Sequence, residues 1–146
     1  MIFCRIKENI GASLHDSRTN RVETDGENVT FFFPKGFYTE GPQPSWEGSP
    51  AAMSCHIADS DPDGFTVSSF RKKLLGKTVR KECTRQFVEE INKGKAEFEF
   101  VDTFRSYGSI LFRGYLWFPR RPYWRECEIE LYADEIRYFK TEEERE

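Results

Sequence analysis

Long apolar stretches are absent from this 146-residue sequence. No run approaches the roughly 18 apolar residues that a membrane-spanning helix requires. The first ten residues carry charged side chains and lack a small-residue cleavage site, so they do not resemble a secretory signal. We therefore expect a soluble, cytoplasmic protein that has no membrane partner.

Cysteine pairs with the spacing of a zinc site or a redox motif are also missing. The four cysteines are Cys4, Cys55, Cys83 and Cys127, and no two of them form a CxxC pair. Three of the four lie on the apolar side of an alternating run, where a free cysteine behaves as a small buried hydrophobe. We expect four reduced core thiols, no metal site and no cofactor.

Catalytic motifs are equally scarce. The sequence contains no GxSxG element, no phosphate-binding loop and no HExxH motif, and it has only two histidines. Cys55 and His56 are neighbours in an expected strand, so their side chains point to opposite faces and cannot form a dyad. We predict that the protein is not an enzyme. An enzyme built around His15, or around the row of carboxylates described below, is the catalytic alternative.

Four residues near the middle of the chain resemble the first half of a calcium-binding loop. Asp59, Asp61 and Asp63 alternate and are followed by Gly64. The twelfth position of such a loop requires a bidentate Glu, and here it is Phe70. Asp and Gly also suit a tight turn between two strands, and we favour the turn over a calcium site.

Aromatic residues, in contrast, are abundant. They make up 16% of the chain, and phenylalanine alone contributes 14 residues. A chain with this much apolar surface can offset the entropy lost on folding, which excludes a disordered protein. The length is that of one domain. We expect a single domain over residues 1–140 and an acidic, frayed tail over residues 141–146.

Most of the chain shows the two-residue periodicity of β-strands. Asp25-Gly26 between two β-rich runs predicts a hairpin turn. The expected strands cover residues 2–7, 21–24, 28–33, 53–58, 65–72, 77–82, 97–104, 109–118, 124–133 and 136–140. Residues 39–51 are rich in Pro and Gly and are expected to form a loop.

One segment has the periodicity of a helix. Thr84 is a candidate N-cap, Phe87, Val88 and Ile91 form an apolar stripe, and Gly94 provides a stop. The connections between strands are too short for parallel βαβ units. The sequence therefore predicts an α+β fold, mainly a strongly bent antiparallel sheet of about eight to ten strands, with one helix near residues 84–93.

One expected strand carries a row of carboxylates. Trp124, Glu126, Glu128, Glu130 and Tyr132 share one of its faces, with neighbours about 7 Å apart. Such a face is either simply solvated or complementary to a basic protein. The sequence is compatible with both interpretations of this face.

Tryptophan, tyrosine and arginine, the residue types that dominate binding hot spots, cluster next to this row. The candidate partner-binding residues are Trp46, Arg120, Arg121, Tyr123, Trp124, Glu126, Glu128 and Glu130. Alternatively, Trp46 and Trp124 fill the ends of the sheet.

The formal net charge is −3, and the tail over residues 142–146 supplies all of it, so the rest of the chain is neutral. Residues 71–85 nevertheless carry a net charge of +6. The cations of this basic run are Arg71, Lys72, Lys73, Lys77, Arg80, Lys81 and Arg85. A sheet edge protected by lysines and a nucleic-acid-binding surface both produce such a run. We favour the protected edge, because Phe70 is the only nearby aromatic residue available to stack on bases.

Several short segments together resemble a loosely defined group of small single-domain bacterial proteins. They are Leu14-His15-Asp16-Ser17, Gly76-Lys77-Thr78-Val79-Arg80-Lys81-Glu82, Ile91-Asn92-Lys93-Gly94-Lys95 with Phe98-Glu99-Phe100, and Glu126-Cys127-Glu128-Ile129. The group has no assigned function, and some of its members resemble immunity-type proteins that neutralise toxins. The resemblance implies no catalytic residues. The absence of catalytic motifs and the candidate aromatic, arginine and acidic surface residues predict a non-enzymatic binding protein, and the resemblance implies an immunity-like protein that occludes a protein partner. The alternative is a nucleic-acid-binding domain that uses the basic run, and an uncharacterised enzyme is the second alternative.

Overall fold

The computed structural model describes residues 2–5, 11–41, 44–72 and 76–141, with the backbone alone for residues 2–5 and Lys72. These residues form thirteen strands, one α-helix and one short 3-10 turn, and every strand pairing is antiparallel. The fold is thus predominantly antiparallel β with one helix, as the sequence predicted. Within the described part of the chain, no helix is both long and apolar enough to cross a membrane.

The strands are arranged in three sheets. The five-stranded sheet has the order β1 (Ile2–Arg5), β13 (Ala133–Lys140), β7 (Ala51–Ile57), β5 (Asn28–Phe33) and β4 (Arg21–Thr24). The six-stranded sheet has the order β3 (Ser17–Thr19), β10 (Glu97–Ser106), β11 (Ser109–Trp117), β12 (Trp124–Leu131), β8 (Phe65–Lys72) and β9 (Thr78–Glu82). A small third sheet pairs β2 (Ala12–Ser13) with β6 (Tyr38–Thr39).

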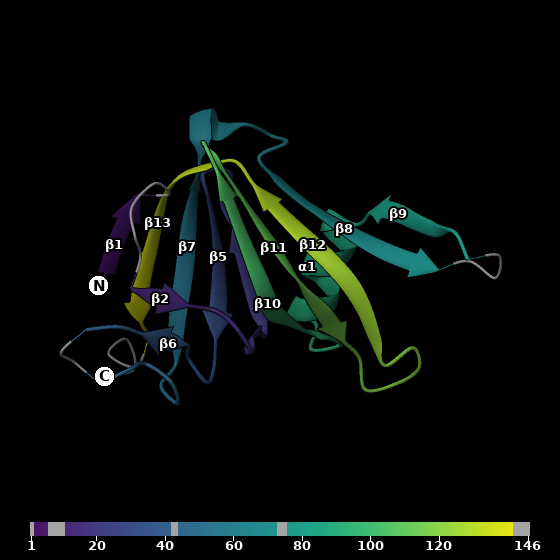
Figure 1. Ribbon diagram of the computed structural model, residues 1–146, viewed down its shortest axis with the longest axis horizontal. Coiled ribbons are helices and arrows are strands. Elements are labelled where there is room, and N and C mark those ends of the chain that lie inside the picture. The colour runs from purple at the N-terminus through teal and green to yellow at the C-terminus, as the bar shows by residue number, and fades with distance from the viewer. Residues whose placement is uncertain (1, 6–10, 42–43, 73–75, 142–146) are drawn as a thin grey trace.

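The two large sheets are joined at one end, from which their strands fan out (Figure 1). The chain passes there from β7 to β8 through the 3-10 turn Ala58–Ser60, and from β12 to β13 through the single residue Tyr132. The backbone N–H of Ala58 donates to the Tyr132 carbonyl at 2.8 Å, and that of Tyr132 donates to the Gly64 carbonyl at 2.9 Å. These bonds hold together the two segments through which the chain passes from one large sheet to the other.

Aromatic side chains from both sheets meet in one core. The Phe100 ring of β10 contacts the rings of Phe31 and Phe33 of β5, with centroid distances of 5.6 and 5.4 Å. It also lies 5.1 Å from Phe112 and 4.9 Å from Phe98 in its own sheet. All five rings are almost fully buried. Edge-to-face contacts of this kind add to the free energy gained by burying apolar area.

Helix α1 (Thr84–Asn92) confirms the predicted helix and its apolar stripe. Phe87 and Ile91 are buried, and Gly94, with a φ of +73°, ends the helix as expected. The expected N-cap is wrong, because Cys83 occupies that position. The Thr84 hydroxyl instead accepts a hydrogen bond from the backbone N–H of Val67 at 2.9 Å and so fastens the helix to β8.

The Asp25-Gly26 hairpin is also confirmed. It joins β4 to β5, and Gly26 adopts a φ of +89° that suits glycine. The Asp25 carboxylate accepts hydrogen bonds from the backbone N–H groups of Glu27 at 2.9 Å and Asn28 at 2.6 Å. These bonds lower the pKa of Asp25.

Three expectations about the strands need correction. The single bent sheet is replaced by three sheets, and the described residues form thirteen strands instead of eight to ten because β2, β3 and β6 contain only two or three residues each. Segments this short show no period that a sequence pattern can reveal. The expected strand over residues 124–133 is two strands, since the chain leaves the six-stranded sheet at Tyr132 and not at Asp134 and Glu135.

Candidate functional site

One side of the six-stranded sheet faces away from the core, and we call it the outer face. Alternate residues of neighbouring strands form it, as the strand registers show. Its main residues are Arg18, Ser68, Phe70, Arg80, Glu97, Glu99, Arg113, Tyr115, Trp117, Trp124, Glu126, Glu128 and Glu130. The intervening residues Cys127, Ile129 and Leu131 of β12 are buried, so this alternation fixes the direction of the carboxylates.

Three aromatic rings cluster at one end of the outer face. Tyr115 makes an edge-to-face contact with Trp124 at a centroid distance of 5.4 Å and lies 6.1 Å from Trp117. The Trp117 indole donates a hydrogen bond to Glu99 at 2.8 Å, and the Arg18 guanidinium lies 5.2 Å from the centre of the Trp117 ring. Trp124 is 55% exposed. The cluster is therefore held by neighbouring side chains and still open to solvent.

Glu126 differs from the other carboxylates of β12. In the register it lies between Tyr115 of β11 and Phe70 of β8, and Trp124 precedes it on the same face. The described part of the chain provides no ion pair or side-chain hydrogen bond to Glu126. A free carboxylate among three aromatic side chains is the arrangement that receives a cationic group.

The two carboxylates that follow along β12 already have partners. Glu128 pairs with Arg113 at 3.3 Å, and Arg113 also lies over the Phe104 ring at 5.4 Å. Glu130 lies beside the Tyr132 hydroxyl, and this carboxylate raises the pKa of the tyrosine. Glu126 is therefore the member of the row that is available to a binding partner.

The structure places the predicted partner-binding residues in two separate regions. Arg120, Arg121 and Tyr123 lie in the exposed loop between β11 and β12, next to Trp124. The expectation that Trp46 lies on a binding surface is corrected, because its side chain is only 7% exposed. Its ring centroid lies 5.8 Å from that of Phe37 in the core. Its Pro- and Gly-rich loop folds back onto the protein, so Trp46 fills the end of the sheet instead of forming a surface.

Two residues of this region were missed by the sequence reasoning. Phe70 and Tyr115 flank Glu126, but they belong to β8 and β11, far from residue 126 in the sequence. Each lies in an expected strand with the correct alternation. The missing information was the order of the strands, which a single sequence does not provide.

The basic run contains an edge strand. β9 pairs only with β8 at the margin of the sheet, and all five of its residues are exposed. Arg80 shares the outer face with Phe70, with its guanidinium 5.9 Å from the ring, whereas Lys81 points to the opposite side. Arg85 lies on α1 and pairs with Glu89 at 3.3 Å. Lys73 lies outside the described residues. The described cations are thus spread over two faces and the helix.

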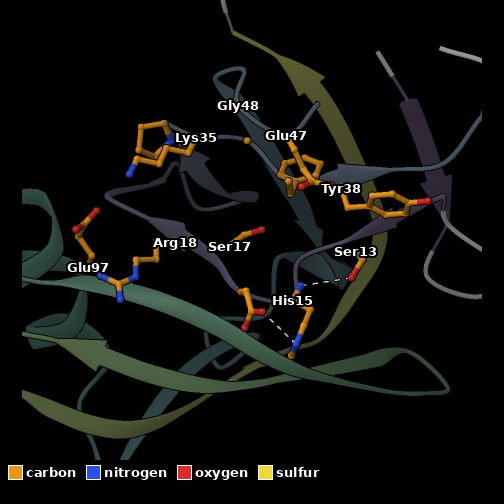
Figure 2. Close-up of a pocket in the computed structure, with 13 residues that line it drawn as sticks. Ser13, His15, Ser17, Arg18, Lys35, Tyr38, Glu47, Gly48 and Glu97 are labelled. Carbon is orange, nitrogen blue, oxygen red and sulfur yellow. Dashed lines mark hydrogen bonds and ion pairs between the residues drawn. The ribbon is translucent and has the colours of Figure 1, made fainter. Parts of the chain in front are cut away.

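A cleft of about 740 Å³ lies near the small third sheet (Figure 2). Arg18, Lys35 and Glu97 lie at one end in this view, and Ser13 and His15 lie at the other. Basic and acidic side chains both line the cleft, so it has no strong preference for ligands of one charge. It contains none of the three glutamates of β12.

His15 is the only histidine in this cleft, and both of its ring nitrogens face acceptors. Nδ1 lies 2.8 Å from the Val101 carbonyl oxygen, and Nε2 lies 3.3 Å from the Asp16 carboxylate. The hydrogen bond to Val101 and the charge of Asp16 raise the pKa of His15 above its ordinary value of 6.5. A ring held in this way favours the imidazolium form and offers no free nitrogen to act as a general base.

Two of the cysteines meet in space. The thiols of Cys83, the N-cap residue of α1, and of Cys127 lie beside each other and interact. The bonds from Cys127 and Ser69 lower the pKa of Cys83 to about 7, whereas the pKa of Cys127 is raised. Burial raises the pKa of Cys55 to about 12. Cys55, Cys83 and Cys127 are free and buried, as predicted, and the side chain of Cys4 lies outside the described residues.

The acidic segment that resembles half of a calcium loop forms a turn. The Asp61 carboxylate accepts a hydrogen bond from the backbone N–H of Asp63 at 2.9 Å, and Asp59 adopts a φ of +54°. Among the residues that the structure describes, no three His, Cys, Asp or Glu side chains gather in a way that could hold a metal ion.

Comparison with protein-family models, with curated proteins and with solved structures finds no match to this chain.

Proposed function

We propose that this chain is a non-enzymatic binding protein that occludes a partner protein with its outer face, and that the partner presents basic side chains there. The observation that carries the proposal is the free carboxylate of Glu126 among Tyr115, Phe70 and Trp124. A lysine or arginine placed on it gains a charge-assisted hydrogen bond and contacts with the aromatic rings.

The surroundings of Glu126 support the same kind of partner. Carboxylates outnumber guanidinium groups on the outer face, which favours approach of a positively charged surface. Trp124 and Tyr123, both more than half exposed, are residue types that commonly anchor interfaces. An occluding role also agrees with the resemblance to bacterial immunity-type proteins, and the free cysteines support a reducing, cytoplasmic location.

A titration with short peptides tests the charge requirement. The probes are two acetylated pentapeptides that differ only in a central arginine or its uncharged isostere citrulline. We expect the arginine peptide to shift the NMR signals of Tyr115, Trp124 and Glu126, and the citrulline peptide to leave them unchanged. The variant Glu126→Gln should lose the response, whereas Glu27→Gln, in the β4–β5 turn, should keep it. Equal responses to both peptides would contradict the proposal.

Capture of proteins from source-cell lysate tests whether the same surface binds a complete partner protein. The immobilised wild-type chain is compared with Trp124→Ala, Glu126→Gln and the control Glu27→Gln in nuclease-treated lysate. The captured amount of a genuine partner should fall at least about tenfold in the first two variants, which is typical of hot-spot residues. Proteins retained equally by all variants would show that the outer face is not the binding surface.

A further inference from the structure

The outer margin of the six-stranded sheet is an unpaired strand edge. β9 pairs only with β8, and no other strand in the described part of the chain lies on its far side. Figure 1 shows β8 and β9 extending away from the rest of the molecule. Val79, the apolar residue of β9, is 38% exposed. The strand is therefore accessible along its whole length.

The hydrogen-bond pattern fixes which backbone groups of β9 point outward. The Cys83 N–H donates to the Val67 carbonyl at 2.8 Å, so Cys83 faces its partner strand. In an antiparallel pair this orientation alternates, and Val79 and Lys81 therefore also bond toward β8. The N–H and C=O groups of Thr78, Arg80 and Glu82 point away from the sheet. They form three unpaired positions that a further strand can use.

The side chains around this edge determine which strand it can accept. Arg71, Lys77, Arg80 and Lys81 surround it, and basic residues on an edge repel other basic strands, including β9 of a second copy. The carboxylate of Glu82 is occupied, because it accepts hydrogen bonds from the backbone N–H and hydroxyl of Thr84. Opposite charges on neighbouring strands attract. The edge is therefore selective for an acidic strand.

We propose that β9 binds an extended acidic peptide by strand addition, with backbone hydrogen bonds to Thr78, Arg80 and Glu82. Neighbouring acidic residues of the peptide pair with Arg80 on the outer face and Lys81 on the opposite face. An apolar residue lies against Val79. Affinity comes from the backbone bonds and selectivity from these three side-chain positions. The site does not depend on the proposed function of the outer face.

Nucleic acid fits this surface less well than an acidic peptide. A phosphate backbone requires cations along one continuous surface, but Arg80 and Lys81 lie on opposite faces of the sheet. Binding of single strands also requires exposed rings for base stacking. Phe70, the nearest ring, is half-buried and lies beside the Arg80 guanidinium.

Hydrogen exchange of individual amides tests the proposal directly. In the free protein we expect fast exchange for Thr78, Arg80 and Glu82, and slow exchange for Val79 and Lys81. The probe is an acetylated hexapeptide of sequence Glu-Val-Glu-Glu-Val-Glu. Its binding should protect the three outward amides and leave the other two unchanged. Binding without new protection would overturn strand addition and indicate adhesion by charge alone.

The control for backbone pairing is a modified peptide, so the protein stays unchanged. A second hexapeptide of the same sequence carries N-methyl groups on the three amides that pair with β9, so it keeps every charge and cannot form the ladder. We expect its affinity to fall at least tenfold. Equal affinity of the two peptides would contradict the proposal, as would tighter binding of a single-stranded oligonucleotide of equal charge.

Two variants of the protein separate the contribution of backbone hydrogen bonds to peptide binding from the contribution of charge. Thr78→Pro removes one outward N–H at the first residue of the strand, where proline is tolerated, and leaves the charge unchanged. We expect about fivefold weaker binding of the acidic hexapeptide, as for the loss of one hydrogen bond. Arg80→Gln should weaken binding and reduce its dependence on salt. Wild-type affinity in both variants would rule out this edge as the site.

Discussion

At the scale of single residues, Gly114 is a position that has no room for a side chain. It lies in the middle of β11 opposite Phe100, next to the β-bulge of β10. A Cβ atom at this position would lie 1.8 Å from the Glu99 carbonyl oxygen. We expect Gly114→Ala to lower the free energy of unfolding by about 3 kcal/mol, the upper part of the usual range for overpacking. Urea denaturation measures the change.

A matched glycine provides the control for this prediction. A Cβ at Gly11 would meet its nearest neighbour, the Cβ of Glu40, at an ordinary contact distance of 3.5 Å. Gly11→Ala should therefore change the stability by less than about 0.5 kcal/mol, as is usual for surface substitutions. Similar losses in both variants would show that close approach of β10 is not the cause.

His15 should make the stability depend on pH. Its pKa is raised in the folded chain by the Val101 carbonyl and the Asp16 carboxylate. The stabilisation is therefore fully present below the unfolded-state pKa and is lost as the pH rises through the folded-state pKa. An NMR titration should give a pKa above 6.5 for His15. In Asp16→Asn the pKa should move down, and an unchanged titration would contradict the assigned cause.

Alternation along the strands predicted the direction of single residues well. It placed Trp124, Glu126, Glu128 and Glu130 on one face, and the structure confirms this arrangement. Alternation could not predict the position of the Trp46 side chain, because a loop rich in Pro and Gly has no regular period. Whether such a loop exposes or buries its aromatic residue depends on contacts with distant residues such as Phe37.

At the scale of elements, Asn92 connects α1 to the edge of the five-stranded sheet. Its side chain accepts a hydrogen bond from the Val22 N–H at 2.8 Å and donates one to the Val22 carbonyl at 2.8 Å. The amide thus occupies the backbone groups that a neighbouring strand would use, and it protects the β4 edge.

Removal of this amide should destabilise the protein. Asn92→Ala leaves two backbone groups of Val22 without partners, and we expect a loss of about 1–3 kcal/mol. In Asn92→Asp the protonated carboxyl group at low pH can replace both the acceptor and the donor, so the loss should be smaller there than at neutral pH, where the carboxylate has no donor. The exposed Lys95→Ala serves as the control. Thermal and urea unfolding measure all three, and a neutral Asn92→Ala would contradict this role.

The predictability of each element depended on how local its signals are. Helix α1 and the β4–β5 hairpin carry their apolar stripe, terminating glycine and turn residues within a few positions, and both elements were predicted, although the N-cap of α1 was not. β2, β3 and β6 exist only because distant segments pair with them. The division of the strands at Tyr132 likewise depends on bonds to Ala58 and Gly64, which no local pattern reveals.

At the scale of the whole molecule, Phe100 links the two large sheets. Its ring contacts β5 of one sheet and β11 of the other, and it is 1% exposed. We expect Phe100→Ala to cost about 3–5 kcal/mol. Phe104→Ala, on the same strand but 49% exposed, should cost less than about 1 kcal/mol. Urea unfolding followed by both circular dichroism and tryptophan fluorescence gives the two values.

The same measurement tests whether the sheets unfold together. Trp46 reports on the core, whereas Trp117 and Trp124 report on the outer face. A single core implies coincident transitions for all probes. Separate transitions in the wild-type chain would show that the sheets are independent units.

The six-stranded sheet carries charges of opposite sign in two places, although the chain without its tail is neutral. Carboxylates dominate the outer face, while the β9 margin is basic. At an ionic strength of about 0.01 M the screening length is about 30 Å, so the margin of one molecule attracts the face of another. Head-to-tail contacts of this kind build a ring where the rotation between copies closes, and an open chain where it does not. At about 0.15 M the screening length falls to about 8 Å, and the same solution disperses into separate molecules.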